Sequence, residues 1–296
     1  MNATGRAVTI FLAHDLLGEG PYWHPERRTL TRVDVHAGDL VTCDPSTGEQ
    51  STRWLGEPLS FAVPRLAGGL VVGVGMRVAL LDQDGSLQSL ADLSSELSEN
   101  RLNDAVCDSL GRLWAGTMSA KNPRSLGTGE AALYRIDPDG SYEKVLTGLT
   151  LSNGMDWLDD GRTLLHIDSD QHRIDRYDVN IDAGRLASRR TLVDFDTDLG
   201  LPDGMTVDSG NGLWLAFFGS SQIRHYTADG VEDDRINLPV SCPTSVMLGG
   251  EDFRDLYITT SSHRLSSVEA AQQPLAGCLF RFRVTVAGRP QYQFAG

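Results

Sequence analysis

A short apolar segment recurs six times along the chain, preceded by polar turns such as DSLG, DDG or DSGNG. The six copies are TLTRVD from residue 29, GLVVGV from 69, RLWAGT from 112, TLLHID from 163, GLWLAF from 212 and DLYITT from 255. Their leucines at 30, 70, 113, 164, 213 and 256 are separated by 40, 43, 51, 49 and 43 residues. This period is typical of β-propeller blades.

Further strand-like segments lie on both sides of each copy. The downstream strands often run into Asp-Gly turns, as in DQDG, DPDG and TADG, which indicates tight hairpins. The upstream strands are expected to begin at Gly20, Phe61, Asn103, Asn153, Asp203 and Pro243, and a fourth strand, such as STRWL, LQSLA, YEKVL or TLVDF, follows most copies. Together they predict an all-β fold, a six-bladed β-propeller with four antiparallel strands per blade, in one domain spanning residues 1–296. The sixth blade lacks an obvious fourth strand, so we expect VTIFLA at residues 8–13 to supply it and close the ring.

Composition and charge narrow the classes of partner. The chain has 296 residues, of which 40% are hydrophobic and 22% charged, as in an ordinary globular protein. The net charge of −14 disfavours nucleic acid and anionic membranes. No signal or membrane segment is evident near the N-terminus, so a cytoplasmic protein is expected. Four cysteines, without any CxxC, are expected to be reduced and packed.

Polar residues stand at the predicted starts of the first strands. In a propeller these starts ring one mouth of the central channel, so equivalent positions become neighbours. The positions are Glu19, Ser60, Asn103, Asn153, Asp203 and either Cys242 or Pro243. Carboxylate and amide oxygens suit a hard cation, which predicts one divalent metal ion, with Ca, Zn, Mn and Fe(II) all open. The competing interpretation, that Asn-Gly and Asp-Gly at 153 and 203 are only turns, does not explain the shared register.

The loops between the second and third strands are expected at the same mouth. Two of them are long, near residues 118–131 and 261–277. We expect these two to act as gate and selectivity elements.

Several long segments carry a family resemblance: LGEGPYW, NRLNDAVCDSLGRLWAGTM, LTLSNGMDW, LPDGMTVDSGNGLW and QPLAGCLF. Together they resemble the family of gluconolactonase, senescence marker protein (regucalcin) and luciferin-regenerating enzyme, with bacterial sugar lactonases closest. The resemblance implies that Glu19, Asn153 and Asp203 are metal ligands and that Arg101 and Asn103 bind substrate. It also implies that Asp203 is the general base. Ser119, Ala120 and Lys121 stand where some members carry a sugar-binding acidic residue, so the resemblance does not fix the substrate.

The resulting hypothesis is metal-dependent hydrolysis of a sugar (aldono-)lactone to the aldonic acid, with the metal as Lewis acid and an activated water. Either Asp203 or a hydroxide on the metal acts as the base. Arg101 is expected to hold substrate or to pair with Asp104, so Asp104 is a further candidate substrate-binding residue. Two alternatives are an organophosphate or aryl-ester hydrolase on the same scaffold and a non-catalytic calcium-binding propeller. The quaternary state stays open between a monomer and a small homo-oligomer.

Overall fold

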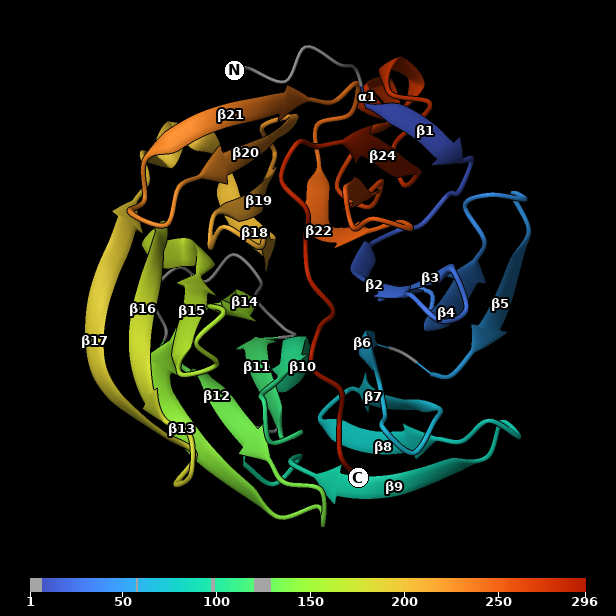
Figure 1. Ribbon diagram of the computed structural model, residues 1–296. Helices are drawn as coiled ribbons and strands as arrows, with labels where there is room; N and C mark the ends of the chain where they lie inside the picture. The colour runs from blue at the N-terminus through green and yellow to red at the C-terminus, as the bar shows by residue number, and fades with distance from the viewer. Residues whose placement is uncertain (1–6, 57, 97–98, 120–128) are drawn as a thin grey trace. The chain divides into compact units, whose positions relative to one another are not determined.

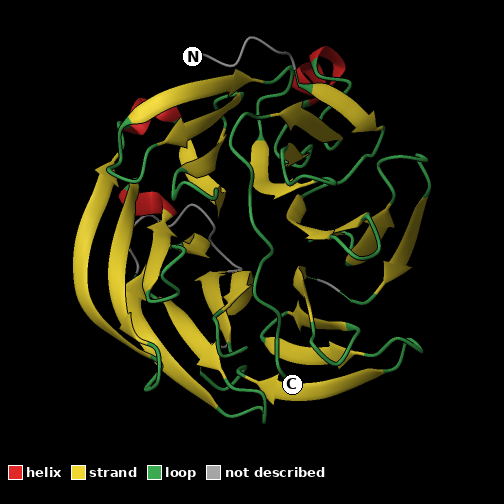
Figure 2. Ribbon diagram, viewed as in Figure 1, coloured by secondary structure: helices red, strands yellow, loops and turns green. Residues whose placement is uncertain are grey.

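Strands account for almost all of the regular structure (Figure 2). The computed structural model describes residues 7–56, 58–96, 99–119 and 129–296. Within these ranges the helices are α1 (Ser267–Gln272) and the 3₁₀ turns η1 (Ser169–Gln171) and η2 (Thr197–Leu199). None of the described helices is long and apolar enough to cross a membrane.

The strands form six four-stranded antiparallel sheets, which we number as blades in chain order (Figure 1). Blade 1 contains β2 (Gly18–His24), β3 (Thr29–Asp34), β4 (Asp39–Cys43) and β5 (Gln50–Trp54). Blade 2 contains β6 (Leu59–Pro64), β7 (Leu70–Val74), β8 (Arg77–Leu81) and β9 (Leu87–Asp92). Blade 3 contains β10 (Asn100–Cys107), β11 (Leu113–Ser119), β12 (Ala131–Ile136) and β13 (Tyr142–Leu149).

The remaining three blades repeat the pattern. Blade 4 contains β14 (Ser152–Trp157), β15 (Thr163–Asp168), β16 (Arg173–Asn180) and β17 (Arg185–Asp194). Blade 5 contains β18 (Leu201–Val207), β19 (Leu213–Phe218), β20 (Gln222–Tyr226) and β21 (Glu232–Asn237). Blade 6 contains β22 (Pro243–Gly249), β23 (Asp255–Thr260), β24 (Leu279–Arg283) and β1 (Val8–Phe11). The protein is therefore all-β, with the six blades of a β-propeller, as predicted.

The predicted role of the N-terminal strand is confirmed. β1 pairs antiparallel with β24, with Val8 opposite Arg281 and Phe11 opposite Leu279. Blade 6 is thus completed by a strand from the other end of the chain. The first strands begin up to three residues earlier than predicted, at Gly18, Leu59, Asn100, Ser152 and Leu201, while Pro243 is as predicted.

The chain contacts divide the molecule into two compact units of three blades each. The first unit comprises residues 7–56 and 195–290 of the described chain, which form blades 5, 6 and 1. The second comprises residues 58–194 and 291–296, which form blades 2, 3 and 4.

The recurring leucines form the cores of the blades. Five of them are fully buried, namely Leu30, Leu113, Leu164, Leu213 and Leu256. Each contributes about 2 kcal/mol by removing its side chain from water. Leu70 is partly exposed because it begins β7 next to a turn. In the second unit Trp114 and Trp157 meet edge to face at 5.5 Å between ring centroids, which joins blades 3 and 4.

The C-terminal residues pack on the second unit where its first strands β6 and β10 end. Phe294 is fully buried, and its backbone N–H donates to the carbonyl oxygen of Pro64 at 2.9 Å. The next residue, Ala295, donates to the Gly111 carbonyl oxygen at 2.9 Å. Residues 291–296 therefore tie blade 2 to blade 3.

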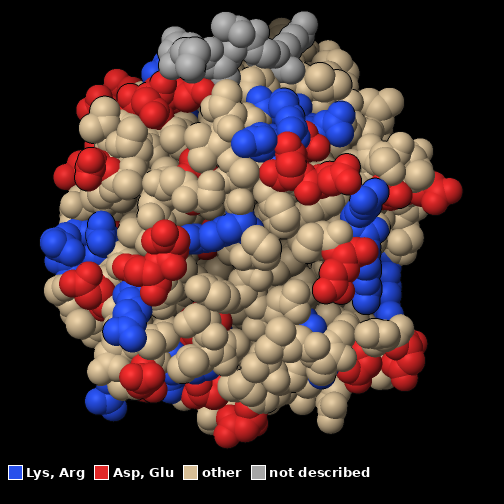
Figure 3. All heavy atoms as spheres, in the orientation of Figure 1, with Lys and Arg blue, Asp and Glu red and all other residues tan. Residues whose placement is uncertain are grey.

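Charges are mixed on the molecular face shown in Figure 3, where basic and acidic side chains lie among each other. No continuous basic patch is seen on this face. All four cysteines are buried free thiols, as expected.

Candidate metal centre

The first strand of every blade departs from regular pairing at the same place. In each blade one residue of the first strand pairs with the residue four positions after the recurring leucine: Gly18 with Asp34, Leu59 with Val74, Leu102 with Thr117, Ser152 with Asp168, Pro202 with Phe217, and Pro243 with Thr260. In blades 2 to 6 the register then shifts within the next three residues, and in blade 1 it shifts one residue later, between Glu19 and Tyr22, because Glu19 still pairs with Val33. Such bulges redirect side chains and are common beside active sites.

We call the residue directly after this pair the bulge residue. The six bulge residues are Glu19, Ser60, Asn103, Asn153, Asp203 and Thr244. Five of them are the residues predicted from sequence. The sixth prediction, Cys242 or Pro243, is wrong, because the pairing of Pro243 with Thr260 makes Thr244 the equivalent residue.

Three bulge residues make the same hydrogen bond to the next blade. Ser60 Oγ donates to the Leu102 carbonyl oxygen at 2.5 Å, Asn103 Nδ2 to that of Ser152 at 3.0 Å, and Thr244 Oγ1 to that of Gly18 at 2.5 Å. In each case the acceptor belongs to the residue just before the next bulge residue. These bonds fix the spacing between adjacent first strands and stabilise each contact by about 1 kcal/mol.

The other three bulge residues are Glu19, Asn153 and Asp203, the ligands that the family resemblance implies. Ionised carboxylates cannot donate such a bond, so Glu19 and Asp203 cannot serve the same bracing function. The same repeated position therefore carries residues that brace adjacent blades in three blades. In the other three blades it carries residues with side-chain oxygens that could bind a cation. Two carboxylates and one amide oxygen form a donor set that suits a hard divalent cation.

In the second unit, hydrogen bonds orient the amide of Asn153. Its Nδ2 donates to Ser169 Oγ at 3.1 Å, and its Oδ1 accepts from Asn103 Nδ2 at 3.2 Å. Because the nitrogen is engaged with Ser169, the oxygen is the atom directed to Asn103, and a carbonyl oxygen has a second lone pair. Asn103 in turn accepts from Arg101 Nη1 at 2.8 Å. The predicted substrate-binding pair therefore also supports the predicted amide ligand.

In the first unit, Glu19 and Asp203 lie on strands that both contact β22. Asp203 is 7% exposed. Gly20, after Glu19, has φ of +50°, and an added methyl group there would meet no described atom within 4 Å. The backbone beside Glu19 thus borders open space. These observations fit a site that receives an ion on its carboxylate side.

Within the described part of the chain, no group of three or more His, Cys, Asp or Glu side chains is placed to hold a metal ion. The predicted ligand set is of another composition, since it contains two carboxylates and one amide. Carboxylate and amide oxygens are ligands that suit hard divalent cations, whereas thiolates and imidazoles suit softer metals.

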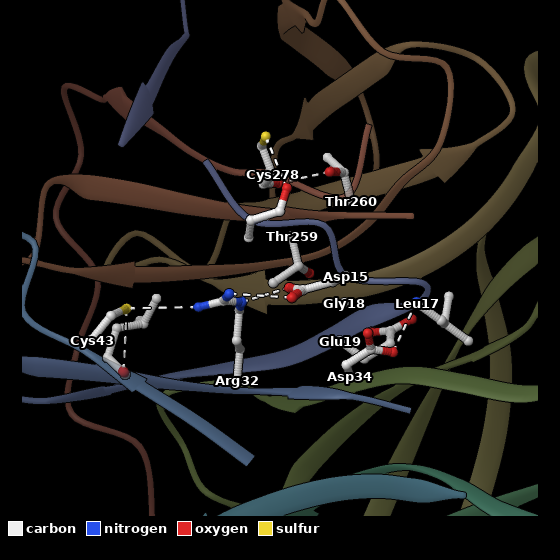
Figure 4. Close-up of polar contacts among 12 residues, drawn as sticks. Asp15, Leu17, Gly18, Glu19, Arg32, Asp34, Cys43, Thr259, Thr260 and Cys278 are labelled. Carbon is white, nitrogen blue, oxygen red and sulfur yellow. Dashed lines mark hydrogen bonds and ion pairs between the residues drawn. The ribbon is translucent and has the colours of Figure 1, made fainter. Parts of the chain in front are cut away.

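A buried aspartate anchors the segment that leads to Glu19 (Figure 4). The Asp34 carboxylate accepts the backbone N–H groups of Leu16 at 2.7 Å, Leu17 at 3.1 Å, His36 at 3.2 Å and Ala37 at 3.3 Å. It therefore fixes both the segment before Glu19 and the adjoining loop between β3 and β4.

Asp168 does the same in blade 4. Its carboxylate accepts the N–H of Leu151 at 3.0 Å and of Thr150 at 3.2 Å, together with the Thr150 hydroxyl, just before Asn153. Sequence reasoning missed both aspartates. The available signal was their identical offset, four residues after Leu30 and Leu164.

Replacing Asp34 with alanine is expected to weaken both the fold and the site. Four partly buried hydrogen bonds to backbone N–H groups are lost, which should cost roughly 2–4 kcal/mol of unfolding free energy. The displacement of Glu19 should lower divalent-metal affinity at least about tenfold, measured by calorimetric titration. Asp44→Ala is the matched control, because Asp44 accepts the Ser46 N–H in an exposed turn of the same blade. Equal metal affinity in both variants would show that Asp34 does not position Glu19.

A model of the family described as "SMP-30/Gluconolactonase/LRE-like region" matches residues 17–262. The chain belongs to this family.

Relatives match the chain over nearly its whole length. A regucalcin from Danio rerio is 36% identical over 284 residues, covering 95% of both chains. A 6-deoxy-6-sulfogluconolactonase from Pseudomonas putida is also 36% identical, covering 95% of this chain and 96% of the relative. The crystal structure of a calcium-binding protein, regucalcin, from Agrobacterium tumefaciens has a TM-score of 0.91 at 24% identity, covering 98% and 97% of the two chains. The sequence-based family assignment and the propeller fold are thus confirmed.

The carboxyl group of Asp104, next to Asn103, has a raised pKa. Burial raises the pKa of Asp104 to about 6, the Ala105 backbone N–H opposes the rise, and Asp156 adds to it. Asp156 is itself buried and accepts hydrogen bonds from the Trp157 backbone and from Gln291 Nε2. Asp104 therefore takes up a proton in mildly acidic solution and can then donate a hydrogen bond.

His166 is a buried neighbour of the Asn153 strand. Its Nε2 lies 2.7 Å from Ser152 Oγ, and the residue is fully buried. Burial lowers the pKa of His166 to about 4, against the opposing effect of Asp168 and Asp175. The histidine is thus neutral at pH 7, and its contact with Ser152 supports the strand that carries Asn153.

This pKa predicts an acid-linked loss of stability. The unfolded chain binds the His166 proton near pH 6.5 and the folded chain only near pH 4, so stability falls as the pH drops between these values. The difference amounts to about 3 kcal/mol at its limit. Urea unfolding from pH 7.5 to 4 should therefore be less pH-dependent in His166→Gln than in the wild type. Parallel curves would contradict the assignment, and the contribution of Asp104 cancels because it is common to both proteins.

Of the two long loops predicted at the mouth, the structure describes only the second completely. Residues 120–128, including Ala120 and Lys121, lie outside the described residues, so the predicted gate at 118–131 has only its ends described. The loop at 261–277 contains α1, whose start is fixed by a capping box between Ser266 and Glu269.

Proposed function

We propose that this protein hydrolyses a sugar lactone to the corresponding aldonic acid, with one divalent metal ion held by Glu19, Asn153 and Asp203. The observation that carries the proposal is the division of the six bulge residues: three brace adjacent blades, and the other three are two carboxylates and an amide. Family membership and the P. putida lactonase among the relatives supply the reaction class.

Each nearby residue has a defined part in the proposed reaction. When bound, a divalent ion supplies Lewis-acid polarisation of the ester group. The Asp203 carboxylate accepts a proton from the water whose oxygen attacks the carbonyl carbon. The bond from that carbon to the ring oxygen breaks, and the ring oxygen leaves as a hydroxyl after taking a proton.

Arg101 and Asn103 orient the substrate hydroxyls in this proposal. Arg101 Nη1 is held by the Leu102 carbonyl oxygen and by Asn103 Oδ1, both at 2.8 Å. This fixes a positive charge beside the amide ligand, where it stabilises negative charge developing on the carbonyl oxygen. Asp104, protonated in mildly acidic solution, adds a hydrogen-bond donor for the same sugar.

The test measures hydrolysis for each combination of metal ion and substrate. The protein is stripped with a chelator, reloaded separately with Ca, Zn, Mn or Fe(II), and assayed by pH indicator with five- and six-carbon aldonolactones and with paraoxon. Proton release above the spontaneous rate, lost on stripping and restored by at least one ion, is expected for a lactone. Faster turnover of paraoxon would indicate an organophosphate hydrolase, and stoichiometric metal binding without any turnover would indicate a calcium-binding protein.

A further inference from the structure

The loop between β23 and β24 carries an arginine for which the structure shows no acidic partner. Arg264 is exposed, and its guanidinium carbon lies 5.6 Å from the centroid of the Phe218 ring. In the described part of the chain it forms no ion pair. The aromatic face thus orients the cation without neutralising it.

Phe218 places this arginine beside the strand of Asp203. In the β18 and β19 pairing, Phe218 is opposite Leu201, two residues before Asp203. The thiol of Cys242 also indicates that Arg264 and Asp203 are close to the same place. Burial is the main cause that raises the pKa of this thiol; the Asp203 carboxylate raises the pKa further, and Arg264 lowers it. Both charged groups therefore lie within electrostatic range of one sulfur atom.

The base of the same loop is fixed next to the approach to Glu19. The backbone N–H groups of Ser262 and His263 donate to the Leu16 carbonyl oxygen at 3.2 and 3.0 Å, and Ser261 Oγ donates to it at 2.7 Å. Leu16 is held in turn by Asp34. Arg264 follows directly on this anchored segment, so its backbone is held in a fixed relation to the strand that carries Glu19.

Two histidines lie in contact next to Arg264 in the first unit. The rings of His36 and His263 lie 4.2 Å apart between centroids and are tilted by 48°. They come from the loops between the second and third strands of blades 1 and 6. The contact joins the two loops next to Arg264.

We propose that Arg264, oriented by Phe218, is a subsite for an anionic group on the lactone substrate, such as a phosphate or sulfonate on the carbon farthest from the carbonyl. This inference rests on the proposed function and names its substrate class. A guanidinium is suited to tetrahedral oxyanions because its N–H groups bind two oxygens together. In a chain of net charge −14, a cation that forms no ion pair in the described part of the chain offsets the repulsion that such a substrate would meet.

The test compares glucono-lactone with its 6-phosphate and 6-sulfonate forms. In Arg264→Gln the ratio of kcat/KM for either anionic lactone to that for the unsubstituted lactone should fall at least about tenfold, because a charge-assisted contact is lost. Arg28→Gln removes the same charge from an exposed ion pair with Glu251 and should leave the ratio unchanged. A loss with only one of the two anions would identify the group that the subsite accepts.

An unchanged ratio in Arg264→Gln, or an equal fall in Arg28→Gln, would overturn the subsite. If the wild type hydrolyses none of the lactones, the proposed function fails, and the subsite is then tested by calorimetric binding of 6-phosphogluconate against gluconate. The subsite predicts that Arg264→Gln weakens binding of the phosphorylated acid alone. Equal binding of the phosphorylated acid by wild type and variant overturns it in that case too.

Discussion

Replacing Asp203 with alanine is expected to abolish lactone turnover and metal retention together. The substitution removes one of two carboxylate donors and the proposed proton acceptor from a position that is 7% exposed. We expect kcat/KM to fall by at least about 1,000-fold, as when a group needed only in the transition state is removed. Metal content after gel filtration and initial rates with the best lactone are the two measurements.

Asp203→Asn separates the two functions of this side chain. The amide keeps an oxygen that can bind a cation but cannot accept the proton from water at neutral pH. We therefore expect partial metal retention with turnover still reduced by a comparable factor. Full activity in Asp203→Ala would remove the proposed mechanism, while full activity in Asp203→Asn would remove only the proton-acceptor role.

Replacing Arg32 with methionine is expected to give the largest loss of stability among the substitutions considered. Arg32 is 1% exposed and binds the Asp15 carboxylate through Nε at 2.6 Å and Nη2 at 3.2 Å (Figure 4). Burial raises the pKa of Asp15, and Arg32 opposes that rise. Without its partner the buried carboxyl should cost about 3–5 kcal/mol, measured as unfolding free energy in urea.

A double variant tests the cause of that loss. Asp15→Leu together with Arg32→Met removes both charges, so most of the stability should return. Glu251→Gln, which breaks the exposed pair with Arg28, should change stability little. If the double variant is as unstable as Arg32→Met alone, the loss comes from packing rather than from an unpaired buried charge.

The architecture could be predicted because its signal is repeated. Leucines at a blade-length period specify each second strand, and five of those leucines are fully buried. In three blades an Asp-Gly turn specifies the hairpin between the third and fourth strands. The missing fourth strand of blade 6 correctly predicted the role of residues 8–11. The starts of the first strands were less accurate, because the bulge interrupts pairing and the strand continues on its upstream side.

Only those site residues could be predicted whose side chains are recognisable in the sequence as metal or substrate ligands. Glu19, Asn153 and Asp203 are visible as oxygen donors in one register. The register of blade 6 was misjudged because Pro243 and Cys242 gave no polar signal, and the pairing of Pro243 with Thr260 identifies Thr244 instead. Asp34 and Asp168 were missed because they act on backbone N–H groups, and such contacts follow from chain geometry rather than from residue type.

The pairing of β1 with β24 also constrains how the protein is made. Residues 8–11 are translated more than 260 residues before their partner strand at 279–283, so this edge strand stays unpaired through most of synthesis. Until then blade 6 cannot form, and β24 would in turn present an unpaired edge if residues 8–11 were sequestered. Blade 6 is therefore expected to close only after residues 279–283 have been synthesised, so its fourth strand waits longest for a partner.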